Sequence, residues 1–138
     1  MEAIKITIQA TVEAPAEKVW SCYTQPEHIT RWNFATDDWQ CPWATNDMRV
    51  GGRYVARMEA KDGSFGFDLE AVYEAIEPGR SFVYGMGDRK VEVQFSIVEA
   101  GTQVVVTFDA ETENPIEMQR AGWQAILDNF KRYTEGLK

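Results

Sequence analysis

The feature that most constrains the fold of this chain is a long amphipathic helix predicted at its end, from Asn114 to Leu137. Apolar side chains recur there at intervals of three and four residues, which is the spacing of one face of an α-helix. Asn114 and Glu117 predict an N-cap and a capping-box carboxylate, and Pro115 suits the first helical position. At about 1.5 Å per residue the helix spans about 36 Å. It therefore crosses a whole small domain and needs a large apolar surface against its buried face.

The segment before this helix has the pattern of an antiparallel sheet. Apolar and polar residues alternate within it, as expected of strands with one buried face. The alternating segments are residues 4–12, 54–58, 65–73, 82–86, 91–97 and 104–108. Two short helices are predicted after the first strand, at residues 14–23 and 26–32, followed by a loop over residues 33–46 and one further short strand around Asp47–Val50. The expected fold is thus α+β, with a sheet of six to seven strands around the C-terminal helix.

Composition and charge narrow the function classes. A chain of 138 residues predicts a single domain over residues 1–138. The formal charge of −8, without a basic stripe, argues against nucleic acid and against anionic membrane surfaces as partners. No apolar run approaches the length of a membrane span and the N-terminus has no signal-peptide pattern, so a soluble cytoplasmic protein is expected. Cys22 and Cys41 are predicted to be reduced and structural, and with a single histidine they predict neither a metal nor a cofactor.

Five segments, taken together, resemble the SRPBCC (START-like) superfamily. They are Ala14–Trp20, Tyr23–Trp32, Met48–Tyr54, Ala71–Pro78 and the pair Gly122-Trp123. More narrowly, they resemble the branch named for activators of the heat-shock chaperone ATPase. The resemblance implies a helix-grip fold, in which a curved antiparallel sheet surrounds the C-terminal helix and two short helices close one end. It implies no single activity, because members include lipid carriers, hormone receptors, polyketide cyclases, ring-hydroxylase subunits and chaperone regulators.

A sheet wrapped around one helix predicts a cavity between them. Its walls are expected from inward strand positions, the tryptophan-rich loop and the helix that covers them. The candidate ligand-binding residues are Trp32, Trp39, Trp43, Met58, Phe67, Tyr84, Met86, Phe108, Met118, Gly122 and Ile126. This set is mostly aromatic and methionine, so we predict binding of a small hydrophobic or aromatic molecule.

The same residues also fit purely structural roles. Every alternating strand packed under a helix needs core residues such as Ile126. Gly122 either allows close contact between helix and sheet or makes room for a ligand, and Trp123 is expected mainly to anchor the helix on the sheet. Trp39 and Trp43 fall in the predicted loop, where large apolar groups often mark a pocket rim or an interface.

Catalysis has little support in the sequence. His28 is the single histidine and is expected to be a solvated surface residue, and no nucleophile–base motif is present. One rival hypothesis is an enzyme of cyclase or hydrolase type, which would use Tyr54, Tyr73, Tyr84 or Asp47 as a proton donor in the same cavity. A second rival, implied by the resemblance, is a module that contacts a chaperone and regulates its ATPase. Membrane insertion is not expected, and a homodimer is left open.

Overall fold

The computed structural model describes residues 4–137 of the chain. The helices are α1 (Ala16–Thr24), α2 (Pro26–Trp32) and α3 (Ile116–Gly136). The strands are β1 (Lys5–Val12), β2 (Trp39–Gln40), β3 (Ala44–Asn46), β4 (Arg53–Ala60), β5 (Gly66–Glu77), β6 (Ser81–Met86), β7 (Arg89–Val98) and β8 (Gly101–Asp109).

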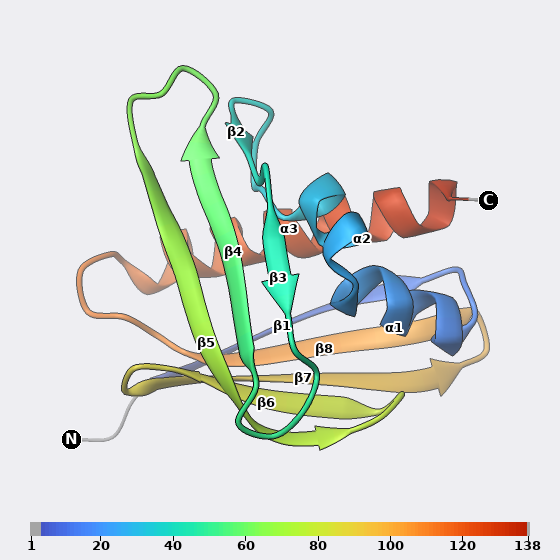
Figure 1. Cartoon of the computed structure of the whole chain (residues 1–138). Helices are drawn as coiled ribbons and strands as arrows, with labels where there is room; N and C mark the ends of the chain where they lie inside the picture. The colour runs from blue at the N-terminus through green and yellow to red at the C-terminus, as the bar shows by residue number, and fades with distance from the viewer. Residues whose placement is uncertain (1–3, 138) are drawn as a thin grey trace.

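All strand pairs in the sheet are antiparallel. The hydrogen-bonded order is β1-β8-β7-β6-β5-β4-β2, and β3 also pairs with β4. Figure 1 shows the sheet curling around α3. The short helices α1 and α2 lie at one end of it, near the end of β1 and the start of β8. The predicted α+β helix-grip fold, with two short helices after the first strand, is confirmed.

The concave face of the sheet carries the core because apolar residues occupy alternate positions of each long strand. Ile8 of β1 lies opposite Val106 of β8, and Val106 lies opposite Val93 of β7. All three side chains are buried. The long twisted strands thus present one continuous apolar surface to the helices.

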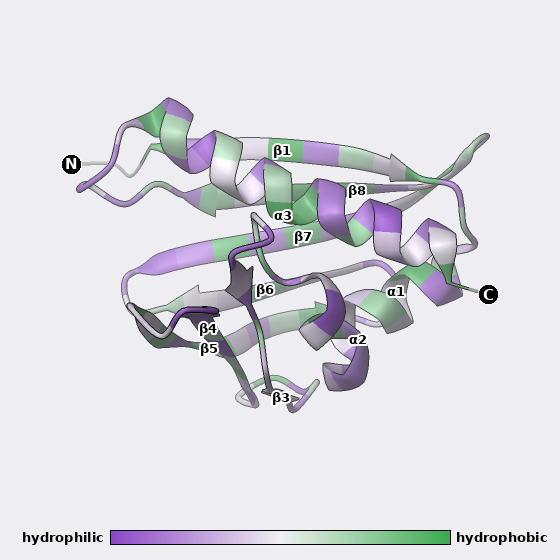
Figure 2. Ribbon diagram, turned by 90° about the horizontal axis from the view of Figure 1, so that it is seen from above, coloured by the Kyte–Doolittle hydropathy of each residue, from purple (hydrophilic) through white to green (hydrophobic). Residues whose placement is uncertain are grey.

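The C-terminal helix covers this surface. Seen from above, α3 runs over β1 and β8 towards α1, with bands of apolar and polar residues along its length (Figure 2). Trp123 stacks on Phe108 of β8 with ring centroids 3.9 Å apart and an angle of 11° between the ring planes. The predicted role of Trp123 as the anchor of the helix is confirmed. On the outer side of α3, Arg120 and Gln124 donate hydrogen bonds to backbone carbonyl oxygens along β1.

The start of this helix differs from the prediction. The helix begins at Ile116, and Pro115 is the N-cap with an extended backbone (ψ 146°) and no side-chain cap. The amide of Asn114 donates to Glu111 Oε2 instead (3.2 Å), so the predicted capping box is wrong. The reason is the buried side chain of Gln119. Its Nε2 donates to the carbonyl oxygens of Glu111 and Asn114, and these bonds hold Asn114 outside the helix.

The predicted loop over residues 33–46 also needs correction, because it contains β2 and β3, which both pair with β4. The strand expected around Asp47–Val50 is wrong by a few residues, since that segment forms the turn into β4. Two or three residues are too few to show an alternating pattern. The turn needs Gly52, where a Cβ atom would lie 2.2 Å from the carbonyl oxygen of Asp47.

Three smaller expectations are tested by the fold. Cys22 and Cys41 are buried free thiols, as predicted. His28 is only partly exposed, and its Nδ1 lies 2.6 Å from the hydroxyl of Tyr133, so this residue links α2 to α3 rather than being solvated. Among residues 4–137, the helices are too short or too polar to cross a bilayer.

Candidate functional site

A cavity of about 180 Å³ lies between α3 and the concave face of the sheet. Strands β1, β4, β5, β6 and β8, all three helices, and the segments after α2 and in β3 contribute to its wall. The lining residues are Ile8, Tyr23, Ile29, Trp32, Asn33, Asn46, Tyr54, Met58, Phe67, Leu69, Tyr73, Phe82, Tyr84, Val106, Trp123, Ile126 and Leu127.

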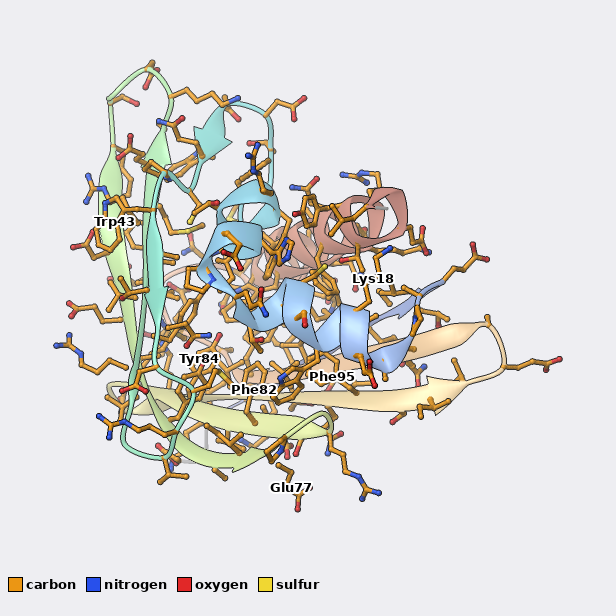
Figure 3. The ribbon with its side chains drawn as sticks, turned by 45° about the vertical axis from the view of Figure 1, so that its right-hand side comes forward. Lys18, Trp43, Glu77, Phe82, Tyr84 and Phe95 are labelled. Carbon is orange, nitrogen blue, oxygen red and sulfur yellow. The ribbon has the colours of Figure 1, made fainter. Side chains whose placement is uncertain are left out.

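Tyrosine and phenylalanine rings from neighbouring strands form the floor of the cavity. Tyr73 of β5 lies directly opposite Tyr84 of β6, because the two strands pair at this register. The Tyr84 ring packs edge-on against Tyr54 of β4 (5.8 Å between centroids) and stacks on Phe82 (6.1 Å, 19°). Figure 3 shows Phe82, Tyr84 and Phe95 in the layer between the sheet and α1. Aromatic pairs at these distances support one another and give the floor a defined shape.

The helices form the opposite wall. Trp123, Ile126 and Leu127 come from α3, and their spacing places them on one side of that helix. Trp32 of α2 is buried, and its indole Nε1–H donates to the carbonyl oxygen of Cys22 (2.8 Å). Because this indole nitrogen is already bonded, Trp32 offers only its apolar ring to the cavity.

Five of the predicted ligand-binding residues line the cavity. They are Trp32, Met58, Phe67, Tyr84 and Ile126. Phe67 is 42% exposed while also lining the cavity, so the cavity reaches the surface beside it. The exposed rings of Phe65 and Phe67 pack against Trp39, which therefore lies next to the opening rather than in the cavity wall.

The other predicted residues lie elsewhere in the fold. Phe108 is buried beneath Trp123, and Met86 is at the end of β6. Met118 is 61% exposed on α3. Trp43 is 45% exposed, and Figure 3 places it on the side of the sheet away from α3.

Gly122 fits neither of the two roles considered for it. A Cβ atom at this position would have no heavy atom within 4 Å outside its chain neighbours and the backbone of its own helix, so close packing of helix on sheet is not the reason for this glycine. Gly122 is not among the lining residues of the cavity either.

The sequence predicted some of the polar groups in the wall. Tyr54, Tyr73 and Tyr84, which the enzyme hypothesis placed in the cavity as proton donors, all line it, because they lie on the inward faces of their strands. Tyr23 lies in α1 and was not among the predicted ligand-binding residues. No pattern in the sequence predicts Asn33 and Asn46 as lining residues, because they fall at the two ends of the predicted loop.

The described wall of the cavity carries no charged side chain. Burial raises the pKa of Tyr54 and of Tyr84 well above the usual value for a phenol, so both keep their protons at neutral pH. Asp47 lies outside the cavity and accepts a hydrogen bond from Arg49 Nε (2.8 Å). Residues 4–137 hold no cluster of three or more His, Cys, Asp or Glu side chains placed to bind a metal ion.

One known family matches nearly the whole chain. The model of the family described as "Activator of Hsp90 ATPase homolog 1-like protein" matches residues 13–135. The chain belongs to this family. The resemblance to the chaperone-activator branch of the SRPBCC superfamily is therefore confirmed, and folds of this AHSA1-like type commonly bind hydrophobic ligands.

Solved structures agree with the family assignment. An AHSA1-like protein from Aeromonas hydrophila is 46% identical to this chain, with a TM-score of 0.90 over 96% of this chain and 92% of that one. A protein from Cytophaga hutchinsonii is 42% identical, with a TM-score of 0.79 and the same coverage. A protein from Nitrosomonas europaea shares the fold at 15% identity, with a TM-score of 0.85 over 98% of this chain and 96% of that one. A comparison of this AHSA1-like chain with curated proteins finds no match.

Proposed function

We propose that this AHSA1-like protein binds a small hydrophobic molecule in the cavity between α3 and the sheet. The observation that carries the proposal is a cavity of about 180 Å³ with an aromatic, uncharged wall and an opening beside Phe67. Pockets that bind small molecules have this mixture of apolar walls and a few polar groups.

The energetics of an empty cavity support the same proposal. At about 24 cal/mol per Å³, a cavity of this volume would cost up to about 4 kcal/mol of stability if it held no water. That is a large part of the ~5–15 kcal/mol that holds a domain folded. A chain that retains such a space gains from filling it with a ligand, since a ligand that binds only the folded state adds to its stability.

The test is a ligand screen with two independent readouts. Trp32 and Trp123 line the cavity, so an occupant should change the intrinsic tryptophan fluorescence. It should also raise the melting temperature, by an amount equivalent to about 2.7 kcal/mol at a hundredfold excess of ligand over Kd. The screen should cover fatty acids, sterols and fused-ring aromatic compounds, together with native mass spectrometry of the protein as purified. If neither readout responds to any compound and no small molecule is retained, the proposal is wrong.

The enzyme hypothesis would have to use the same cavity. The described lining residues include no serine, cysteine, histidine or carboxylate, and Asp47 is outside. Burial keeps the tyrosine phenols protonated, which suits hydrogen-bond donation and opposes their action as a base. Binding is therefore the function that the geometry supports best.

The chaperone-regulating role stays a prediction from the family description. Its test is to add the purified chain to an Hsp90 ATPase assay and to compare the rate with and without it. An unchanged rate at saturating concentration would rule out this role for the chain alone.

A further inference from the structure

Several of the polar groups that line the cavity bond to one another or to the backbone. The hydroxyl of Tyr73 donates to Asn46 Oδ1 (2.7 Å), and Asn46 Nδ2 donates to the carbonyl oxygen of Thr24 (2.6 Å). Asn33 Nδ2 donates to the hydroxyl of Tyr54 (3.2 Å). These groups are held in place by the protein.

Two hydroxyls in the wall differ from these. Within residues 4–137, the hydroxyls of Tyr23 and Tyr84 have no hydrogen-bond partner. They are not sealed inside the core either, because among the described side chains only Thr134 Oγ1 is both fully inaccessible and unpartnered. The two phenol groups are therefore open to whatever occupies the cavity. An accessible hydroxyl without a protein partner can donate to a ligand that enters the cavity, in place of the water that otherwise accepts this bond.

The two tyrosines reach the cavity from different layers of the fold. Tyr84 is 7% exposed and belongs to β6, whereas Tyr23 belongs to α1. Both rings pack against Phe82, at 6.1 Å and 5.9 Å between centroids. Tyr23 also contacts Trp32 and Phe130. Both tyrosines therefore line the cavity and share Phe82 as a packing partner.

The charge of the wall decides which kind of ligand atom can accept hydrogen bonds from the hydroxyls of Tyr23 and Tyr84. Burial, with a smaller effect of neighbouring tyrosines that begins with Tyr23, raises the pKa of Tyr84 well above the ordinary value for a phenol. Burial likewise raises the pKa of Tyr23, so both groups remain donors at neutral pH. A carboxylate would enter a wall whose described residues include no basic side chain, and it would lose its hydration without a counter-ion. An uncharged oxygen loses much less and can still accept both hydrogen bonds.

We propose that the ligand is an uncharged ring compound with a carbonyl oxygen, which accepts hydrogen bonds from the hydroxyls of Tyr84 and Tyr23 while its ring contacts the apolar wall. The inference rests on the proposed binding function and specifies the chemistry of the same site. Met58, Trp123 and Ile126 supply the apolar contacts.

The experiment compares three probes of nearly the same shape by isothermal titration calorimetry. They are 2-acetylnaphthalene, its hydrocarbon isostere 2-isopropenylnaphthalene, and 2-naphthoate. The ketone should bind about tenfold more tightly than the hydrocarbon, which is the effect of one or two net hydrogen bonds. The carboxylate should bind the most weakly of the three.

Variants assign the effect to the two hydroxyls. Tyr84→Phe and Tyr23→Phe should each reduce the preference for ketone over hydrocarbon several-fold while leaving hydrocarbon binding intact. Tyr133→Phe is the matched control, because Tyr133 is not among the lining residues and its hydroxyl lies 2.6 Å from His28 Nδ1, so this variant should keep the wild-type preference. The wild-type ratio needs no variant, so a variant that misfolds does not remove the test.

Each outcome separates this inference from the proposed function. Equal binding of ketone and hydrocarbon would overturn the inference and leave hydrophobic binding standing. Tightest binding of 2-naphthoate would overturn the uncharged ligand class. A preference for the ketone that survives in both Tyr84→Phe and Tyr23→Phe would overturn the assignment to these hydroxyls. Failure of all three probes, together with failure of the wider hydrophobic screen, would refute the binding function itself.

Discussion

At the scale of single residues, the neighbouring positions 122 and 123 of α3 differ in how they pack. Trp123 stacks on Phe108 and also lines the cavity, so one side chain both anchors the helix and contacts the candidate site. Gly122, directly before it, packs against nothing within 4 Å of where a Cβ atom would be. The shape of the helix surface is therefore set by the tryptophan, and the glycine is not required sterically.

We expect Gly122→Ala to stabilise the protein. Glycine inside a helix is less favourable than alanine by about 0.5–1 kcal/mol, and the new methyl group meets open space. The melting temperature should rise by about 2–4 °C per kcal/mol in thermal unfolding followed by circular dichroism. Ala121→Gly, at the exposed position one residue earlier, is the control and should lower it by a similar amount. A lower melting temperature for Gly122→Ala would mean that neighbouring atoms close over this position in solution.

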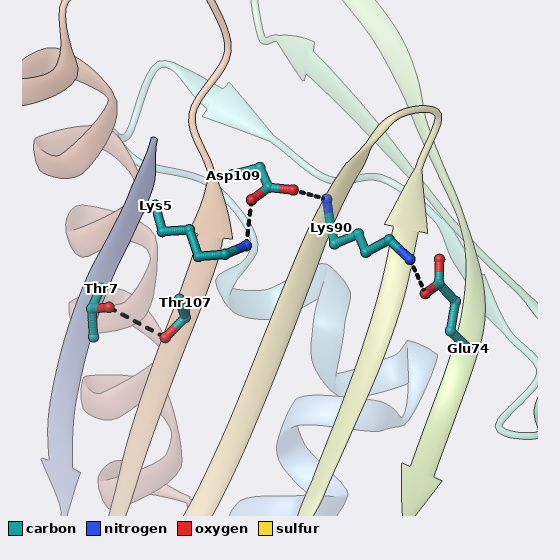
Figure 4. A network of polar contacts seen from close by, with 6 residues as sticks. All are labelled: Lys5, Thr7, Glu74, Lys90, Thr107 and Asp109. Atoms are coloured by element: carbon teal, nitrogen blue, oxygen red, sulfur yellow. Dashed lines mark hydrogen bonds and ion pairs between the residues drawn. The ribbon is translucent and has the colours of Figure 1, made fainter. Parts of the chain in front are cut away.

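At the scale of elements, ionic and polar contacts join strands across the convex face of the sheet. Figure 4 shows Lys5 of β1 donating to Asp109 Oδ1 (2.7 Å) and the backbone N–H of Lys90 in β7 donating to Asp109 Oδ2 (2.9 Å). The ammonium group of Lys90 in turn donates to Glu74 Oε1 of β5 (2.6 Å). Asp109 is almost fully buried, whereas Lys5 is largely exposed. The end of β8 is thus tied to both of its neighbours through one carboxylate.

We expect Asp109→Asn to destabilise the protein in a pH-dependent way. The hydrogen bond from Lys5, with that from the Lys90 backbone, holds the pKa of Asp109 below its ordinary value of 3.8. A carboxyl with a lowered folded pKa stabilises the fold above its unfolded pKa, and this contribution is lost as pH falls through the folded value. At neutral pH the variant should lose about 1–2 kcal/mol in urea unfolding. The difference from wild type should shrink as the pH is lowered below 3.8.

The control for this prediction is Glu117→Gln on α3. Glu117 is 83% exposed and its carboxylate lies 3.7 Å from Arg120, so the pair should contribute little at any pH. A constant difference between wild type and Asp109→Asn across the pH range would show that the loss comes from packing rather than from the charge.

The elements also show which parts of the fold are readable from sequence. The long strands and α3 were predicted correctly because their apolar residues repeat over many positions. β2 and β3 were missed because each is stabilised by pairing with β4 rather than by a pattern of its own. The start of α3 was misplaced because Gln119 contacts Glu111 and Asn114 through a folded turn, which local capping rules do not include.

At the scale of the whole molecule, the cavity limits the stability of the empty protein. We expect Ile126→Phe, which adds volume to the cavity wall, to raise the stability of the ligand-free protein by about 0.5–2 kcal/mol and to weaken binding of every hydrophobic probe. Thermal unfolding and titration calorimetry on the same samples measure both effects.

Ile97→Phe on β7 is the control, because Ile97 is 84% exposed and far from the lining set. Its stability should stay within about 0.5 kcal/mol of wild type, with unchanged binding. A loss of about 1–3 kcal/mol for Ile126→Phe would indicate overpacking instead, and would mean that the space cannot accept an added ring.

The candidate site was only partly predictable at this scale. Inward positions such as Met58 and Tyr84 follow from the alternation within one strand. Trp39 and Trp43 were expected from their place in an apparent loop, but one lies beside the opening and the other on the outer surface. The hydroxyls of Tyr73 and Tyr54 are bonded to Asn46 and Asn33, which come from other segments of the chain. The alternation within one strand cannot predict such contacts.

The side chains of α3 that reach β1 have a consequence for how copies of this protein meet. An unpaired edge strand is a template on which another chain can add a strand and begin an aggregate. Along β1, Arg120 and Gln124 already occupy the carbonyl oxygens of Thr7 and Gln9, and the backbone N–H of Glu13 donates to Glu135. At the opposite end of the sheet, the edge beyond β4 is divided between the two short strands β2 and β3. A strand could therefore add along β1 only after these side chains of α3 had left it, whereas at the other edge the sheet offers only the two short strands.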